Sequence, residues 1–325
     1  MVKYFQKALG SSGKVICGNN TLDAAGMNVG NHNYLTYNVN DPKYKQQILD
    51  ICDKEDIALV VPLFDIDLKY LTEIKCVLET KNVITAVSKA ELINIANDKF
   101  KTYTYLSSLG FLSPKTYLEL NHAYSEIEKS NINFPLIVKP RFGMGSISVN
   151  IVNNFSELEF HYHSTKLHIE QSYLNMMNKS DDSLVVIQEL MHGHEYGLDL
   201  LHDFNGQYIH HLFKKKVAMR SGETDIAFTF QDEEMDRYAM KLSSLLGHYG
   251  NCDIDMIRGT NGKIYIIDIN PRFGGGYPFT HNSNCNYVNA YISILKNEPI
   301  EPFKPIYNKK LFKDISILSS PNADN

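Results

Sequence analysis

Residues 252–278 read CDIDMIRGTNGKIYIIDINPRFGGGYP, and this stretch decides the fold of the second half of the chain. Two apolar runs, Cys252–Ile257 and Lys263–Ile269, flank Asn261-Gly262. Asn-Gly between two such runs is a strong signal of a β-hairpin, because these residues adopt the positive φ angles of the tight turn. The stretch therefore predicts two antiparallel strands followed by a glycine-rich exit.

One face of this predicted hairpin carries side chains suited to a metal ion and to phosphate. Side chains in a strand alternate between two faces, so Asp268, Asn270 and Arg272 point the same way. Folding at the turn can bring Asp255 beside them. Two carboxylates and an amide oxygen make a site suited to Mg²⁺, and the guanidinium would neutralise a phosphoryl group in transfer. A merely polar hairpin is the weaker alternative, because each buried polar group needs a partner.

A second segment that could bind a ligand is the strand–loop–strand pattern at Pro135–Val152, which contains Lys139. Its glycine-rich turn consists of Gly143, Met144, Gly145 and Ser146. A lysine at a strand end can meet phosphate oxygens, and glycines let backbone N–H groups approach them closely. The spacing is neither a Walker A motif nor a dinucleotide fingerprint. Taken alone, the pattern is read as an ordinary turn beside a surface lysine.

The strand predicted at Leu184–Met191 ends in polar residues. Gln188 and Glu189 interrupt its apolar run shortly before Gly193, where a chain can pass along a flat ring. Backbone groups there could read an adenine edge, and Glu195 could bond ribose hydroxyls. Taken alone, this segment is read as a strand end with polar surface residues.

The composition excludes several function classes. The 325 residues carry 32 Lys and Arg against 37 Asp and Glu, a formal net charge of −5. A weakly acidic chain has no overall field for nucleic acid or an anionic membrane, so we expect neither as a partner. No apolar run indicates a signal peptide or a membrane span. The five cysteines are scattered without a CxxC pair, which favours free thiols in a cytoplasmic protein over disulfides or a zinc site.

The fold class predicted from the alternation of helix and strand signals is α/β, with a small parallel sheet in the first hundred residues. The elements expected there are a helix from Asp41 to about Glu55, a strand at Ile57–Pro62, a helix at Ile66–Thr80, a strand at Val83–Val87 and a helix capped by Ser88. Later elements are a hairpin of Leu198–Phe204 with Gln207–Lys214 and a helix at about Glu233–Leu246. The run Lys214–Lys216 is read as a solvated strand end.

Taken in their order along the chain, these segments resemble the ATP-grasp superfamily. Asp98-Lys99 resembles the entry motif whose lysine contacts nucleotide phosphates, and IVKP at Ile137–Pro140 supplies a second such lysine, Lys139. RFGMGSISV at 141–149 resembles the flexible glycine loop, with Gly143, Gly145 and Ser146 over the phosphates. The residues that resemble the adenine hinge are Gln188, Glu189, Leu190 and Met191, and Glu195 matches the ribose-binding acid. The resemblance assigns Mg²⁺ to Asp255, Asp268 and Asn270, and the transferring phosphate to Arg272.

Within the superfamily the chain is similar to carbamoyl phosphate synthetase large-subunit-like proteins and to ATP-dependent amino-acid ligases, in which an NPRFGGGYP-type ending occurs. VPLFDIDLKYL at Val61–Leu71 resembles a stretch of their N-terminal domain. Arg220 falls where relatives hold an acyl phosphate or a substrate carboxylate. Two features depart from the family: the metal carboxylate, more often Glu, is the shorter Asp268, and the chain begins with a helix-like segment instead of a strand and a glycine turn.

The resemblance implies an ATP-grasp fold behind a small parallel-sheet domain. The expected boundaries are 1–97 for that domain, without its first strand, 98–187 for a lid with the glycine loop, and 188–325 for the subdomain with the metal site. The implied activity is that of an ATP-dependent ligase with two Mg²⁺ ions, or Mn²⁺ in their place. A carboxylate would attack the γ-phosphate held by Arg272 and Arg220, and an amine or ammonia would capture the acyl phosphate.

Other interpretations stay open at this point. A phosphotransferase would phosphorylate its substrate and release it, and a regulatory ATP-binding subunit would have no turnover. The absent first strand favours the regulatory subunit, whereas the full set of metal and phosphate residues argues against it. A homodimer is also compatible with the sequence.

Overall fold

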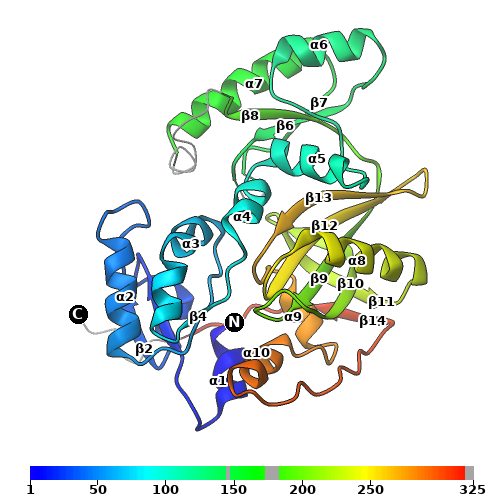
Figure 1. The fold of residues 1–325 in the computed structure, drawn as a ribbon. Coiled ribbons are helices and arrows are strands. Elements are labelled where there is room, and N and C mark those ends of the chain that lie inside the picture. The colour runs from blue at the N-terminus through cyan, green and yellow to red at the C-terminus, as the bar shows by residue number, and fades with distance from the viewer. Residues whose placement is uncertain (144–146, 173–182, 319–325) are drawn as a thin grey trace.

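The computed structural model describes residues 1–143, 147–172 and 183–318 (Figure 1). Gly145 and Ser146 of the predicted glycine loop lie outside the described residues. The N-terminal part contains short parallel strand pairs and helices. Its elements are α1 (Val2–Leu9), β1 (Ile16–Asn19), the 3₁₀ helix η1 (Ala25–Asn28), β2 (His32–Leu35), α2 (Tyr44–Lys54), β3 (Leu59–Val60), α3 (Asp65–Thr80) and β4 (Ile84–Thr85). Strand β1 pairs in parallel with β2, and β3 pairs in parallel with β4, as the helix–strand alternation predicts.

Two expectations for this part are wrong in detail. The helix expected to begin at Asp41 begins at Tyr44, because the Asp41 carboxylate accepts the N–H of Lys43 at 2.8 Å and holds a turn. Ser88 does not cap the following helix, α4 (Ala90–Ala96). Its hydroxyl oxygen instead accepts the N–H of Tyr249, 161 residues away, at 3.0 Å. Each side chain therefore accepts one backbone N–H, but not at the helix start where the sequence predicted it.

The middle of the chain forms a small antiparallel sheet with the order β5-β8-β6-β7. Its strands are β5 (Thr116–Tyr117), β6 (Leu136–Pro140), β7 (Asn150–Val152) and β8 (Val185–Glu189). Helices α6 (Leu120–Glu128) and α7 (Phe155–Glu170) share an apolar core with this sheet, in which Leu136, Val138 and Leu158 are fully buried. Figure 1 places this lid-like unit above the rest of the molecule, connected through α4 and α5 (Lys99–Ser108).

The last part is built on an antiparallel sheet whose described strands have the order β13-β12-β9-β10-β11-β14. These strands are β9 (Gly193–His202), β10 (Tyr208–Arg220), β11 (Glu223–Phe230), β12 (Asn251–Gly259), β13 (Ile264–Asn270) and β14 (Lys309–Phe312). The two predicted hairpins are β9–β10 and β12–β13, and the helix predicted between them is α8 (Glu233–Leu246).

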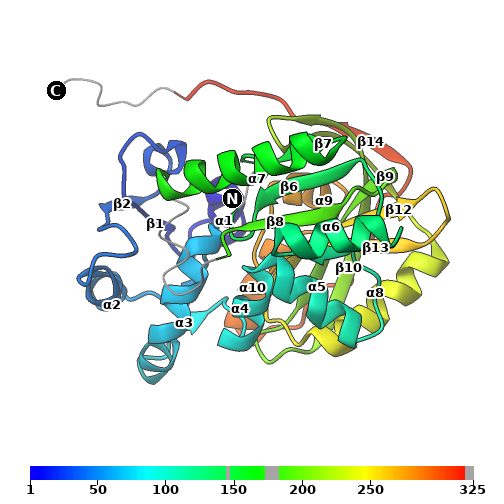
Figure 2. The same cartoon turned by 90° about the horizontal axis from the view of Figure 1, so that it is seen from above.

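The two faces of this large sheet are covered differently. Helices α4, α5 and α8 cover one face, with Leu198, Ile254 and Met235 in a shared core. At one end of the opposite face, a second core joins the sheet to three helices, α1, α9 (Tyr277–His281) and α10 (Tyr287–Leu295). Seen from above, the small sheet lies over the large sheet (Figure 2). On the rest of that face, polar side chains of the large sheet line a cavity that the small sheet also lines. No helix in the described ranges is both long and apolar enough to cross a membrane.

A stacked pair of histidines is buried where β9 ends, behind α8. The rings of His202 and His248 lie 3.9 Å apart, centroid to centroid. His202 Nε2 lies 2.6 Å from Ser243 Oγ, and His248 Nε2 lies 3.0 Å from the Leu200 carbonyl oxygen. Burial lowers the pKa of both imidazoles, and it lowers the pKa of His248 to about 3. The folded protein therefore holds both rings neutral at physiological pH.

Mild acid should destabilise the fold through this pair. Below pH 6.5, the ordinary pKa of histidine, the unfolded chain binds protons that the folded chain binds only near the lowered pKa, so the unfolding free energy falls with pH. In His248→Gln, the loss of unfolding free energy between pH 7.5 and pH 5 should shrink by about 2 kcal/mol. Urea unfolding at both pH values measures this difference. The exposed His163→Gln is the control, and an equal loss in His248→Gln and wild type would contradict the prediction.

Candidate functional site

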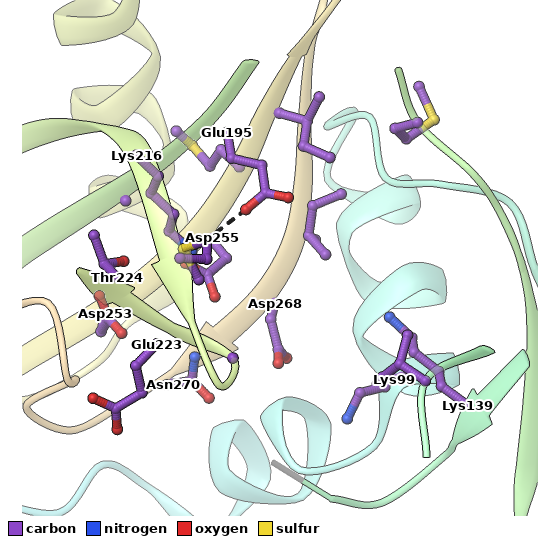
Figure 3. A pocket seen from close by; sticks show the side chains of 18 of the residues that line it. Lys99, Lys139, Glu195, Lys216, Glu223, Thr224, Asp253, Asp255, Asp268 and Asn270 are labelled. Atoms are coloured by element: carbon purple, nitrogen blue, oxygen red, sulfur yellow. Dashed lines mark ion pairs between the residues drawn. The ribbon is translucent and has the colours of Figure 1, made fainter. Parts of the chain in front are cut away.

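A cavity of about 390 Å³ separates the small sheet from the polar face of the large sheet (Figure 3). The predicted site residues among its lining are Lys99, Lys139, Gly143, Gln188, Glu189, Leu190, Met191, Glu195, Asp255, Asp268, Asn270 and Arg272. Residues more than 170 positions apart in the sequence thus face a single space. Their individual roles stay predictions.

The acidic wall of the cavity is the ladder between β12 and β13. Asp255 is the cross-strand partner of Asp268, and Asp253 is the partner of Asn270. The side chains of directly paired residues share a face, so four oxygen-bearing groups line the cavity together. The register shifts between Asp255 and Met256, which accommodates an extra residue on β13. Figure 3 shows Asp268 and Asn270 in this wall.

Two of these carboxyl groups are harder to ionise than usual. Burial raises the pKa of Asp268, an effect that Lys99 and Lys139 oppose. Burial likewise raises the pKa of Asp253 to about 7, with Lys214 opposing the shift and Asp255 adding to it. Sequence reasoning missed Asp253, although its place two residues before Asp255 puts it on the same strand face. A bound cation would favour the ionised form of both of these carboxyl groups.

The donor set fits a hard cation that takes some of its ligands from elsewhere. Asp255, Asp268 and Asn270 offer only oxygen atoms, the ligand type that Mg²⁺ prefers. Within the described residues, no three His, Cys, Asp or Glu side chains are arranged to hold a metal ion by themselves. Mg²⁺ usually completes its octahedral shell with waters and phosphate oxygens, so an incomplete protein shell suits it.

The basic wall lies across the cavity, where Figure 3 shows Lys99 and Lys139 opposite Asp268. Lys99 is the first residue of α5, whose N-cap is the buried Asp98. The carboxylate of Asp98 also holds Arg141 through two hydrogen bonds of 2.8 and 2.9 Å, which ties α5 to the end of β6. Lys99 Nζ donates to the Gly143 carbonyl oxygen at 2.7 Å. Burial and the nearby Lys99 lower the pKa of Lys139 to about 8.

Two further lysines come from β10, in the run Lys214–Lys216 that had been read as solvated. That reading is wrong for Lys214, which is 2% exposed and paired with the fully buried Asp199. Lys216 Nζ lies 2.6 Å from Asp255 and 4.0 Å from Glu195. Burial lowers the pKa of Lys216, but the neighbouring carboxylates outweigh it and the net shift is upward. Alternation along β10 directs both lysines to the cavity face.

The two arginines expected at the phosphate lie in different surroundings. Arg272 lines the cavity, and its guanidinium donates at 2.5 Å to Asp65, the first residue of α3. This pair joins the N-terminal part of the chain to the site. Arg220, at the end of β10, is half exposed and pairs with Asp225 instead. It is absent from the cavity lining, so the structure does not bring it together with the other predicted residues.

The backbone of the glycines at 274–276 lies very close to charged side chains of the cavity. A Cβ at Gly274 would lie 1.9 Å from Asp253 Oδ2, and one at Gly276 would lie 3.1 Å from Lys214 Nζ. At Gly275 it would meet the Glu223 carboxylate at 3.1 Å. The backbone is therefore packed directly against charged side chains, and any larger residue at 274 would displace Asp253.

The model of the ATP-grasp domain family matches residues 96–276, which is more than half of the chain. The chain belongs to the ATP-grasp family. A second family model, the PylC-like N-terminal domain, matches residues 1–86. The predicted resemblance and the predicted fold class, an α/β ATP-grasp fold with a small parallel sheet in front, are thereby confirmed. The exact domain boundaries at 97/98 and 187/188 stay predictions.

Individual relatives are distant. The chain is 23% identical over 290 residues to a carbamoyl phosphate synthase large chain of Clostridium perfringens, a match that covers 86% of this chain but 26% of that protein. Among solved structures, the biotin carboxylase domain of Hydrogenobacter thermophilus 2-oxoglutarate carboxylase, in complex with MgADP and bicarbonate, has a TM-score of 0.76 at 14% identity. It covers 95% of this chain and 70% of that one. An L-amino acid ligase from Bacillus licheniformis has a TM-score of 0.72 at 17% identity, covering 94% and 76%.

The close packing at Gly274 gives a testable consequence. Gly274→Ala should lower the free energy of unfolding by about 1–3 kcal/mol, because the new methyl group overlaps Asp253 and forces a shift in a packed region. Urea unfolding measures the change. Gly26→Ala is the matched control, since a Cβ there meets nothing closer than 3.8 Å. Equal stability of Gly274→Ala and wild type would contradict the packing described here.

Proposed function

We propose that this ATP-grasp protein is a ligase that joins a carboxylate to an amine or ammonia, using ATP and releasing ADP and phosphate. The observation that supports it is a cavity with an acidic wall, Asp255 and Asp268, facing a basic wall, Lys99 and Lys139. A polyphosphate bridged by a divalent cation satisfies both walls at once. The chain spans about a quarter of the carbamoyl phosphate synthase large chain it matches, so that relative's whole reaction is not carried over.

The proposed roles follow the positions of the side chains. Lys99 and Lys139 neutralise the α- and β-phosphate oxygens, and Arg272 neutralises the γ-phosphoryl group in transfer. Glu195, beside Lys216 at the cavity rim, bonds the ribose hydroxyls. The segment from Gln188 to Met191 borders the base. Arg220 would join the γ-phosphate only after leaving Asp225, so its role rests on the family resemblance alone.

Mg²⁺ would be held by Asp255, Asp268 and Asn270, and when bound it supplies charge neutralisation at the β- and γ-phosphates. The number of ions, and Mn²⁺ as a substitute, are part of the proposal. Lys216 would keep Asp255 oriented through its 2.6 Å contact. The cavity walls hold the reactants close and exclude water, which would otherwise hydrolyse an activated acyl group.

The proposed reaction has two steps. A carboxylate oxygen of the first substrate attacks the γ-phosphorus, the bond to the β-phosphate oxygen breaks, and ADP leaves. The nitrogen of the second substrate then attacks the acyl carbon, phosphate leaves with the bonding electrons, and the nitrogen loses a proton to solvent. No covalent bond to the protein is required. We also propose that the protein acts in the cytoplasm, as a monomer or a homodimer. Its proposed partners are small-molecule substrates.

Product analysis tests this proposal directly. The protein is incubated with ATP, Mg²⁺, hydroxylamine and pooled amino and organic acids, and the expected products are ADP and a hydroxamate. Asp268→Asn should abolish both, because the metal site loses a carboxylate. Asp50→Asn, an exposed change on α2, should leave them unchanged. AMP in place of ADP would overturn the acyl-phosphate route, and a product phosphorylated on a hydroxyl group, without hydroxamate, would indicate a phosphotransferase.

The basic wall can be tested by nucleotide binding alone. Lys139→Ala should weaken the binding of MgATP by about 1.5–3 kcal/mol, the contribution of one hydrogen bond to a charged group. Isothermal titration calorimetry measures the change. Lys129→Ala, an exposed lysine on the same small-sheet unit, is the matched control. An unaltered affinity in Lys139→Ala would remove this lysine from the site.

A further inference from the structure

A buried ion pair lies directly beside the two lysines of the basic wall. Asp98 precedes Lys99 in the chain, and Arg141 follows Lys139 by two residues. The side chains of Asp98 and Arg141 are 1% and 4% exposed. Two hydrogen bonds join them, from Arg141 Nε to Oδ1 at 2.9 Å and from Nη2 to Oδ2 at 2.8 Å. A forked contact of this kind combines strength with a fixed geometry.

The carboxylate of Asp98 is fully used by its neighbours. Besides the guanidinium, its Oδ1 accepts the backbone N–H groups of Phe100 and Lys101, at 3.0 and 3.2 Å, and so caps α5. Four N–H groups thus donate to this carboxylate, which is about the number that it can accept. The ammonium of Lys101 lies 3.8 Å from Oδ2, but this side chain is half exposed and contributes little. The buried partner that balances the charge of Asp98 is therefore Arg141.

The two lysines of the basic wall are differently placed. In the part of the chain that the structure describes, neither Lys99 nor Lys139 has a carboxylate within ion-pair distance. Lys99 Nζ donates to the Gly143 carbonyl oxygen, and the acids that act on Lys139 lie across the cavity. Asp98 is the neighbour of Lys99 in the chain and is already paired, so both ammonium charges stay available to an anion in the cavity.

We propose that Arg141 is a positioning residue for nucleotide binding, which pairs with Asp98 and thereby keeps this carboxylate from drawing Lys99 away from the phosphates. The inference rests on the proposed binding of ATP, and it adds how the basic wall keeps its charge. A buried carboxylate without a counter-charge is costly, so without the guanidinium Asp98 would take up a neighbouring ammonium group. Lys99 extends from the adjacent residue, and its loss to Asp98 would leave one lysine instead of two for the phosphates.

A double-mutant cycle tests this inference through the binding of MgATP, measured by isothermal titration calorimetry. Arg141→Gln and Lys99→Ala should each weaken binding about 10- to 150-fold, the range for the loss of one hydrogen bond to a charged group. The combined variant should bind no more weakly than either single variant, because Lys99 is already withdrawn once the guanidinium is gone. A merely structural role of Arg141 predicts instead that the two losses multiply.

Two further variants keep the test decisive if Arg141→Gln does not fold. Arg141→Lys leaves a cation beside Asp98 and should bind MgATP nearly as tightly as wild type. The double variant Asp98→Asn/Arg141→Gln removes the competing carboxylate while asparagine still caps α5, so its affinity should return toward that of wild type. Urea unfolding shows that each variant is folded at the temperature of the titration. Weak binding by both of these folded variants would overturn the inference.

The matched control is Arg237→Gln, which removes an exposed arginine of α8 that pairs with Glu233 and should leave the affinity unchanged. An equal loss in this control would show a general effect of removing an arginine and overturn the inference. If wild type does not bind MgATP, the proposed function falls and the inference with it. If wild type binds MgATP and the losses from Arg141→Gln and Lys99→Ala multiply, the inference alone is overturned.

Discussion

The cross-strand pairing of Asp255 with Asp268 places two negative charges side by side, and the rest of the site supplies positive charge around them. Two carboxylates directly opposite each other on one sheet face repel, and their partial burial weakens the screening by water. Cations from three other elements offset this: Lys216 on β10, Lys139 on β6 and Lys99 on α5. Two of these lysines belong to elements outside the large sheet. The small sheet and α5 therefore contribute positive charge across the cavity from the acidic wall.

The N-terminal part of the chain also contributes a charged side chain next to the acidic wall, Asp65, which pairs with Arg272. Arg272 follows directly after the acidic strand, and its partner Asp65 begins α3, 207 residues earlier. The position at the first turn of a helix suits a carboxylate, and the buried pair with arginine would be costly to break. The pair is a direct side-chain link between the parallel-sheet part and the end of the cavity that Arg272 lines. Its effect is to hold the guanidinium at one place above the acidic wall.

The sequence predicted those features that depend on local chemistry. Asn261-Gly262 determines the hairpin, and period-two alternation then places Asp268 and Asn270 on one face, which is why Asp255 was found as their neighbour. Lys214 was misread because its burial comes from Asp199 on β9 and from the glycines at 274–276, which no local pattern contains. Ser88 was misread for the same reason, since its partner Tyr249 is distant in sequence. Local rules fail here wherever a side chain is used by a tertiary contact.

The two ends of the cavity differ in whether their cations are already paired with carboxylates. Lys214 is held by Asp199, Arg272 by Asp65 and, nearby, Lys313 by Glu223. Within the described ranges, neither Lys99 nor Lys139 has a carboxylate within ion-pair distance; Lys99 reaches only a carbonyl oxygen. A polyanion gains most where cations have not yet been neutralised, so the strongest attraction for phosphates lies at the α5–β6 end. In the proposed nucleotide complex this end would hold the α- and β-phosphates, whereas Arg272, held by Asp65, would reach the terminal phosphate from the other end of the cavity.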